Sequence, residues 1–471
     1  MHLPLRTKLW FGVGQIAEGL KGRVFETFLF FYYEQVLGLS ASLSAAALIL
    51  SVVWDAGCDP LAGSLSDSLR SRWGRRHPLM YASAIPLGVT FFLLFRPPAA
   101  LGQAGLFVWL AIFSVLARTC LSAYSIPHFA LGAELSNDYH ERTSVVAFRS
   151  WFQQVAAWSV TPLAFSLFFT STAQYQNGQL DPAAYPGFAA FFAVVMVASI
   201  LASAAGTHDR IPFLPRPVEG ARTSGLRRVF GELRDALRSP SFRSFVFAVL
   251  VYAVGVGSQR VLELYMRTYF WRLEPGEIFR VSLFELLGAM VGIPYWARTS
   301  RRLGKKWTFI AGILLYAGFA SLPPLALLLG WFPSHAQSAY LALLALCGCA
   351  AAFGSSGHYA VGGSLMADLV DEHELETGER RAGLLFGVIN FASKFTPVAG
   401  IWLASLVLAW IGLPHAADPS SVDPESLRRL GWVYGPMVFV LMALSSLLLS
   451  RYRISWEHLL EIQAALRARR S

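Results

Sequence analysis

Two aspartates lie four residues apart in an otherwise apolar stretch, within the segment WDAGCDP at residues 54–60. This spacing places Asp55 and Asp59 on one face of a helix. Two ionised carboxylates this close in a medium of low dielectric repel each other, and a bound cation, a proton or a basic partner relieves that repulsion. Because ionisable residues are costly to place inside a membrane, they are functional candidates there by default. The pair therefore predicts a cation or proton site, with a static pair to a nearby arginine as the structural alternative.

The surrounding sequence is typical of a helical membrane protein with many spans. Of its 471 residues, 55% are hydrophobic and only 14% are charged, whereas a soluble protein carries about a quarter charged residues. Apolar runs of roughly 20 residues, enough to cross a bilayer as helices, recur along the chain, and we count about twelve of them. Such runs do not fit the short alternating strands of a β-barrel. The first run lacks the pattern of a cleavable signal and is expected to be a retained span.

The net charge of +10 indicates membrane topology rather than nucleic-acid binding. Alternate loops between the predicted spans are rich in Lys and Arg, at residues 70–76, 210–238 and 298–306, and the intervening loops are nearly free of them. By the positive-inside rule, both termini are cytoplasmic. The four cysteines lie in or near spans and predict no disulfide. We therefore expect a multi-pass protein of the inner (plasma) membrane.

A polar, basic segment divides the chain into two halves. Residues 1–206 and 243–452 each contain about six predicted spans, residues 207–242 form a predicted cytoplasmic linker, and residues 453–471 form a cytoplasmic tail. The loop GSLSDSLRSRWGRR at 63–76 combines an acid, a glycine turn and clustered arginines, and ARTSRRLGKKWT at 297–308 repeats it in weaker form. This echo suits two halves related as parallel repeats. Simple positive-inside anchoring is the alternative for both loops.

Long motifs in both halves carry a family resemblance. They include KLWFGVGQIAEGL (8–20), VVWDAGCDPLAGSLSDSLRSRWGRRHPLM (52–80), SIPHFALGAELSNDYHERTSVVAFR (125–149) and LMADLVDEHELETGERRAGLLFGVINFASK (365–394). The chain resembles the glycoside–pentoside–hexuronide:cation symporters of the major facilitator superfamily, whose best-known member is melibiose permease. The resemblance implies an all-α membrane fold of about twelve transmembrane helices in two pseudo-symmetric six-helix bundles.

The same resemblance implies cation-coupled transport of a sugar or glycoside-type small solute by alternating access. The wider group also contains a lysophosphatidylcholine transporter, so a lysophospholipid or another amphipathic solute is the alternative cargo.

By this resemblance, Asp55 and Asp59 hold the coupling cation, and Ser122 supplies an oxygen where the family has a threonine. Cys58 departs from the pattern because the family has an amide there, and a thiol is a poor ligand for a hard cation. A proton needs only a buried carboxylate. We therefore place proton coupling ahead of sodium coupling, and we expect no metal or cofactor beyond the coupling ion, H⁺ or Na⁺.

The substrate positions also depart from the sugar-binding pattern. Where melibiose permease has two sugar-binding aspartates, this chain has Gly19, beside Glu18, and Ser125. The loss of both acids argues against a galactoside pocket of that type, because a carboxylate accepts two hydroxyl hydrogens at once. Arg149 and Lys394 match basic residues that the family places near the substrate. Further candidates, with ion pairing or aromatic packing as the alternative role, are Tyr124, His128, Trp151, Arg260, Glu263 and Tyr359.

Charged residues also gather at the predicted cytoplasmic ends of the spans. We expect them to form salt bridges between the halves, which close the inner side and break when the halves rock. Solvated helix caps are the alternative. The candidates are Asp67, Arg75, Glu134, Asp138, Arg142, Asp368, Asp371, Arg380 and Arg381.

Two other classes of function are disfavoured. The sequence has no metal-ligand cluster, nucleophile motif or phosphate-cradling glycine loop, which argues against a membrane enzyme. The acid pair in the second predicted span argues against a receptor that does not transport. The expected partners are a small-molecule substrate, a monovalent cation and the lipid bilayer, with no nucleic acid, and the expected state is a monomer.

Overall fold

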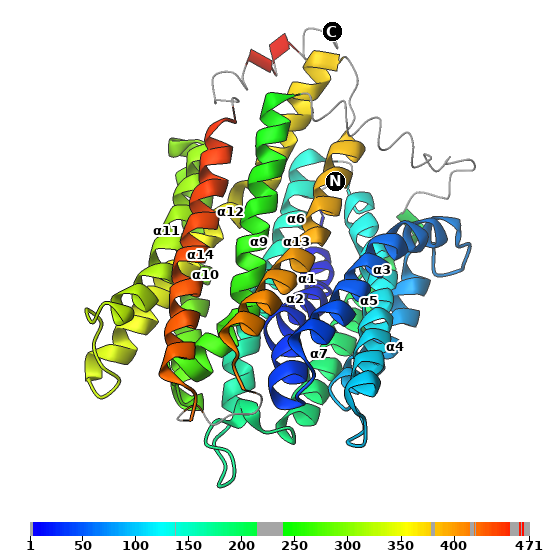
Figure 1. Ribbon diagram of the computed structural model, residues 1–471. Coiled ribbons are helices and arrows are strands. Elements are labelled where there is room, and N and C mark those ends of the chain that lie inside the picture. The colour runs from blue at the N-terminus through cyan, green and yellow to red at the C-terminus, as the bar shows by residue number, and fades with distance from the viewer. Residues whose placement is uncertain are drawn as a thin grey trace. The chain divides into compact units, whose positions relative to one another are not determined.

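The structure describes most of the chain. The computed structural model (Figure 1) covers residues 3–136, 138–213, 239–377, 382–414, 419, 421–452, 461–462 and 464–465, without the side chains of residues 139, 140, 142, 143, 338, 373, 376, 377 and 382–396. In these ranges every regular element is a helix, as expected for an all-α membrane protein. Arg380, Arg381 and most of the predicted linker and tail lie outside the described residues, as do the side chains of Arg142 and Lys394.

The described residues contain thirteen α-helices. The earlier ones are α1 (Leu5–Val13), α2 (Ile16–Arg23), α3 (Ala41–Ser68), α4 (His77–Leu94), α5 (Gln103–Glu134), α6 (Tyr139–Leu167) and α7 (Ala184–Gly206). The later ones are α9 (Pro240–Tyr265), α10 (Pro275–Leu303), α11 (Lys305–Leu328), α12 (Ser338–Thr377), α13 (Ala382–Ile411) and α14 (Pro424–Ser450).

Short helical turns complete the list. The π-helical turns η1 (Val24–Leu29) and η2 (Tyr32–Val36) extend the first segment, and the π-helical turn η5 (Met266–Phe270) extends α9. The 3₁₀ turns are η3 (Gly178–Leu180) and η4 (His208–Phe213). π-helical turns are rare and often lie at functional sites. The first segment and the end of α9, which contain them, are therefore candidate functional regions.

Local sequence fixes where three of the long helices begin. The side chains of Ser40, Asp138 and Asp423 each accept a hydrogen bond from the backbone N–H three residues later, at the starts of α3, α6 and α14. These are N-caps, which satisfy backbone donors that have no partner within the helix. Asp138 therefore caps a helix, which is the alternative role considered for the charged residues at the span ends.

Nine helices in the described part of the chain are long and apolar enough to cross a membrane. They are α3, α4, α5, α7, α9 with η5, α10, α11, α12 and α14. The first predicted span is not among them, because it is divided into short helices and carries several charged residues. The structure therefore supports a multi-pass helical membrane protein, and the count of about twelve spans stays a prediction.

The described chain divides into two compact units. Unit 1 contains residues Met1–Ala221, Glu263–Phe279 and Ala404–Val422, and unit 2 contains Arg222–Leu262, Arg280–Leu403 and Asp423–Ser471. The last turn of α9, together with η5, therefore packs with the helices of unit 1. In unit 2, α11 and α12 approach closely at small residues, and a Cβ added to Gly354 would lie 2.7 Å from the backbone nitrogen of Tyr316.

Gly19 allows α2 to pack closely against α6. A Cβ at this position would clash with the backbone carbonyl oxygen of Gln153, so no larger residue fits without a shift of one helix. The position that carries a sugar-binding acid in melibiose permease is therefore a helix contact here. Gly22, on the same helix, differs, because a Cβ added there would have open space around it to a distance of 4 Å. Close packing of α2 therefore requires glycine at position 19 and not at position 22.

We predict that Gly19→Ala lowers the stability of the folded protein by about 1–3 kcal/mol, because it forces α2 away from α6. Gly22→Ala is the matched control and should leave stability unchanged or raise it slightly, since alanine favours the helix. The thermal unfolding midpoint of each purified variant measures the effect. Equal midpoints for the two variants would contradict the close contact at Gly19.

Candidate functional site

Asp55 lies between two polar side chains of α5. The hydroxyl of Ser122 donates a hydrogen bond to Oδ1 of Asp55 at 2.9 Å, and Nη1 of Arg118 lies 3.8 Å from Oδ2 of Asp55. α3 and α5 pack side by side along their lengths, which brings these residues together. The structure thus places Ser122 beside Asp55, where the family resemblance predicts a ligand oxygen.

Arg118 is a residue of this site for which the sequence patterns gave no prediction. Its Nε donates to the hydroxyl of Ser51 at 3.0 Å, and its guanidinium lies 5.3 Å from the ring centroid of Phe25. The arginine is only 8% exposed. A signal was available, because Arg118 is a single charge in an apolar run and such residues are functional candidates.

More charged side chains lie around Arg118 and Asp55. Glu18 of α2 interacts electrostatically with Lys21, Asp55, Asp59 and Arg118. The ammonium of Lys21 is buried and lies 5.1 Å from the centroid of the Phe25 ring, and Lys21 and Arg118 also interact with Glu26. Arg149 of α6 also interacts with Glu18. We call this set the acid cluster: Glu18, Glu26, Asp55 and Asp59 as acids, with Lys21, Arg118 and Arg149 as bases. The cluster joins the predicted cation pair to the charged part of the first segment.

Two of the predicted substrate residues are buried where α5 meets other helices of unit 1. His128 is fully buried, its ring stacks on Phe11 with centroids 4.2 Å apart, and its Nε2 forms a 2.9 Å hydrogen bond with the backbone oxygen of Phe11. Tyr124 is also fully buried, close to Gly14 of the first segment and Ser203 of α7. Both positions match the packing role considered as the alternative, and a substrate contact for either residue stays a prediction.

The other candidates of unit 1 range from buried to exposed. Arg149 of α6 is half-buried, its guanidinium lies 4.7 Å from the Phe129 ring centroid, and its buried Nε has no hydrogen-bond partner in the described structure. Trp151 is exposed, Ser125 is buried, and Cys58 is a half-buried free thiol beside the two aspartates in sequence. Their roles in binding stay predictions.

The charged residues at the end of α9 form a buried network. Glu263 pairs with Arg267 at 2.6 Å and also accepts from Nη2 of Arg23 at 2.8 and 2.9 Å. Tyr265 donates to Glu34 in the same region. Neighbouring bonds join Tyr269 to Gln35 and Thr268 to Gln179. All of these residues belong to unit 1, so η5 and the end of α9 are tied to the first segment by buried polar contacts.

Arg260, one turn earlier on α9, makes a different contact. Its Nη2 donates to the hydroxyl of Tyr359 on α12 at 3.0 Å, within unit 2. Two predicted substrate candidates are therefore direct neighbours. Tyr359 is partly exposed, which leaves its ring accessible.

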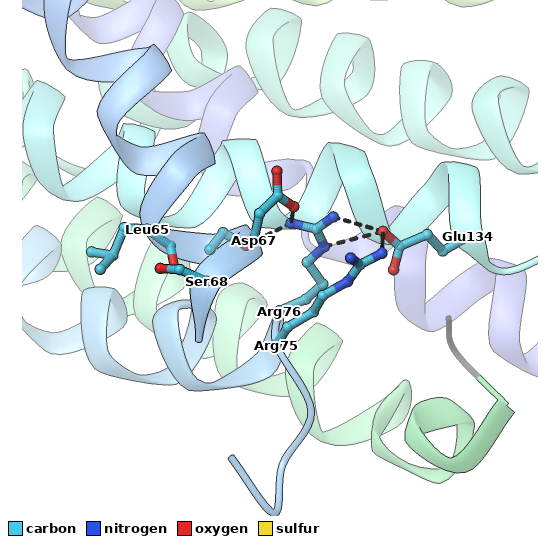
Figure 2. A network of polar contacts seen from close by, with 7 residues as sticks. Leu65, Asp67, Ser68, Arg75, Arg76 and Glu134 are labelled. Atoms are coloured by element: carbon cyan, nitrogen blue, oxygen red, sulfur yellow. Dashed lines mark hydrogen bonds and ion pairs between the residues drawn. The ribbon is translucent and has the colours of Figure 1, made fainter. Parts of the chain in front are cut away.

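A second polar network joins α3, α4 and α5 where the basic loop meets the helix ends (Figure 2). One oxygen of Glu134 accepts from Nη2 of Arg75 and from Nη2 of Arg76, each at 2.7 Å. Arg76 also pairs with Asp67 at 2.6 Å and donates to the hydroxyl of Ser66 at 2.8 Å. These contacts lie within unit 1, so a role for Asp67, Arg75 and Glu134 between the halves stays a prediction.

Unit 2 repeats this arrangement in simpler form. Gly304 (φ 78°) precedes Lys305 as Gly74 (φ 72°) precedes Arg75, and in both loops glycine adopts a left-handed conformation that other residues avoid. Lys305 at the start of α11 pairs with both oxygens of Asp368 on α12 at 2.7 and 2.8 Å. The neighbouring acid, Asp371, is half-buried and interacts electrostatically with Asp368. The echo between the two loops in the sequence thus extends to their three-dimensional contacts.

Comparison with known proteins identifies the family. Residues 10–455 match the model of the family described as MFS/sugar transport protein. The chain belongs to this family. It is 22% identical over 462 residues to the isoprimeverose transporter of Lactiplantibacillus pentosus, with 96% of this chain and 89% of the relative covered. It is 23% identical over 459 residues to the inner membrane symporter YicJ of Escherichia coli K12, with 96% and 92% covered.

A solved structure supports the fold. The inward open conformation of the xylose transporter XylE from E. coli matches with a TM-score of 0.63 and 17% identity, covering 97% of this chain and 98% of that chain. The predicted family is confirmed, and the protein is a membrane transporter of the major facilitator superfamily rather than an enzyme.

We predict that Glu134→Gln destabilises the protein by about 3 kcal/mol, because it leaves two largely buried guanidinium groups with one exposed acid between them. Glu425→Gln is the matched control, since Glu425 pairs with Arg428 and Arg429 at an exposed site, where such pairs contribute about 0–1 kcal/mol. Thermal unfolding of both purified variants measures the difference. A loss at Glu134 no larger than that at Glu425 would show that the network does not stabilise the fold.

Proposed function

We propose that the protein is a cation-coupled symporter that moves a sugar or glycoside-type small solute across the inner (plasma) membrane by alternating access. The observation that carries this proposal is the acid cluster in unit 1, which brings four carboxylates together beside the hydroxyl oxygen of Ser122. Family membership supplies the transport activity. The names of the relatives, a transporter of isoprimeverose and a symporter, favour a sugar and a co-transported ion.

The physical basis of coupling is neutralisation of the acid cluster. Asp55 and Asp59 lie four residues apart on α3, so their charges repel each other across a short distance. A cation or proton that binds there removes this repulsion and changes the field and the helix positions around the site. If the occupied form also binds substrate more tightly, each ligand must raise the affinity for the other by the same factor.

The thiol of Cys58, beside the two aspartates in sequence, favours H⁺ over Na⁺ as the coupling ion. Asp55 itself accepts a hydrogen bond from the hydroxyl of Ser122 and lies near the guanidinium of Arg118. Sodium ions prefer several oxygen ligands, as hard cations do, and Cys58 offers sulfur instead. A proton needs only one carboxylate oxygen. Transport measured at fixed pH with sodium varied separates the two, and strict sodium dependence at neutral pH would overturn proton coupling.

The substrate pocket differs from that of the melibiose permease type. At Gly19, the contact with the Gln153 carbonyl leaves no space for an acid, and at the second position Ser125 is buried. These two features support a sugar held by other polar groups, for which Glu18 and Arg149 are the candidates. They also keep a lysophospholipid or another amphipathic solute as the alternative cargo. A binding screen of sugars, glycosides and lysolipids at two pH values distinguishes them.

We further propose the full topology of the superfamily: about twelve spans in two six-helix bundles, both termini cytoplasmic, and a monomer as the working unit. The nine apolar helices of the described structure and the repeated glycine loops at residues 74 and 304 support this proposal. In this topology the basic loops face the cytoplasm, and the buried network around Glu263 lies toward the opposite side of the membrane.

We predict that Asp55→Asn and Asp59→Asn each abolish uphill accumulation of substrate in membrane vesicles, because neither amide can bind a proton or balance a cation. Counterflow, which needs no ion gradient, should persist in at least one variant. Asp209→Asn is the matched control, since Asp209 is 67% exposed with a contact of 4.0 Å to Arg210, and it should transport normally. Unchanged uphill accumulation in both variants would refute the proposed function.

A further inference from the structure

Asp55, an acid of the proposed cation site, already has a positively charged neighbour, Arg118. Arg118 lies on the α5 face that meets Asp55, so the carboxylate is not an open site for an incoming ion. We propose that Arg118 is a built-in competitor of the coupling ion for Asp55, and that it sets the affinity with which the ion binds. This inference rests on the proposed function, because it assumes that the coupling ion binds at Asp55.

The contacts of Arg118 differ in length, and this difference would allow an ion to replace the arginine at Asp55. Its Nε bond to Ser51 is 3.0 Å long, and its guanidinium packs over the Phe25 ring, whereas its Nη1 is 3.8 Å from Asp55. The guanidinium is therefore anchored on Ser51 and Phe25 and only loosely paired with the carboxylate. An ion can take the place of Arg118 at Asp55 without removing the arginine from its anchor.

Ser122 provides the second half of this arrangement. Its hydroxyl binds the other oxygen of Asp55, Oδ1, at 2.9 Å. The carboxylate is thus oriented by Ser122 on one side, while the oxygen on the other side faces the guanidinium. This second oxygen, Oδ2, is the one that a proton or a cation would compete for.

Arg118 is one of several charged groups near Asp55. The groups that act on Glu18, Lys21 and Arg118 include four carboxylates, and the basic groups of the cluster are Lys21, Arg118 and Arg149. Neutralising Arg118 removes one positive charge directly beside Asp55, and the attraction of the site for any monovalent cation would rise. The arginine therefore lowers ion affinity without removing the site.

The same geometry makes two variants act in opposite directions. Arg118→Gln keeps a side chain that can bond to Ser51 but removes the competing charge, so it should tighten ion binding. Ser51→Ala keeps the charge but removes the anchor, which lets the guanidinium close its 3.8 Å gap to Asp55, so it should weaken ion binding. Arg118→Lys retains a charge at the position and is the matched control.

The experiment measures ion-dependent thermal stabilisation of the purified full-length protein without substrate. The unfolding midpoint is followed against Na⁺ concentration, with choline as the balancing ion, and against pH. For whichever ion stabilises the wild type, Arg118→Gln should bind at least tenfold more tightly, which for protons is a shift of the midpoint by one pH unit upward. Ser51→Ala should bind at least threefold more weakly, and Arg118→Lys should stay within threefold of the wild type.

Asp55→Asn distinguishes a failure of the proposed cation site from a failure of the role proposed for Arg118. It should abolish the ion-dependent shift both alone and combined with Arg118→Gln. If the wild type shows no ion-dependent shift, or if Asp55→Asn retains it, the proposed cation site is wrong. If the site behaves as expected but Arg118→Gln binds the ion no more tightly than the wild type, the role of Arg118 is wrong. Should Arg118→Gln fail to fold, Ser51→Ala decides alone, because unchanged or tighter binding there overturns the inference.

Discussion

The chemistry proposed for unit 1 depends on one electrostatic constraint, the gathering of four carboxylates from the first segment and α3 beside basic groups of the first segment, α5 and α6. In a medium of low dielectric, unbalanced charge of this kind is stable only with basic groups, protons or ions beside it. Arg118 and Lys21 supply part of that balance, and each also packs on the ring of Phe25. In the proposed mechanism, the coupling ion supplies the further positive charge.

Several close ion pairs in the described part of the chain join one helix to another. Arg76 with Glu134, Lys305 with Asp368 and Arg23 with Glu263 all have nitrogen–oxygen distances of 2.7 or 2.8 Å. These pairs anchor one helix to another, and a close pair resists separation. Arg118 and Asp55, in the middle of long helices, are 3.8 Å apart. The difference suits the proposed mechanism, in which the short pairs anchor helix packing and Asp55 exchanges Arg118 for the coupling ion.

Sequence patterns predicted those features that depend on neighbours within one segment. The spacing of Asp55 and Asp59 predicted their shared face, and the glycine followed by two basic residues predicted the repeated loops at Gly74 and Gly304. Arg118, as a single charge in an apolar run, could have been identified as a functional candidate from the sequence. Its pairing with Asp55 could not, because that contact depends on the packing of α5 against α3, which no local pattern encodes. Likewise, helical spacing fits Glu263 to Arg260 and Arg267 equally well, and only tertiary contacts direct Arg260 to Tyr359 and Arg23 to Glu263.

Gly19 shows how close packing between two helices limits which side chains the site can hold. An acid at position 19 would suit a sugar hydroxyl, yet the Gln153 carbonyl occupies the space that its Cβ would need. The neighbouring Glu18 lies about 100° around the helix from Gly19 and interacts electrostatically with Asp55 and Arg118. A carboxylate in the first segment is therefore available to the ion cluster. In the proposed mechanism, Glu18 is a candidate for both substrate recognition and ion binding, which would connect directly the two ligands that a symporter must couple.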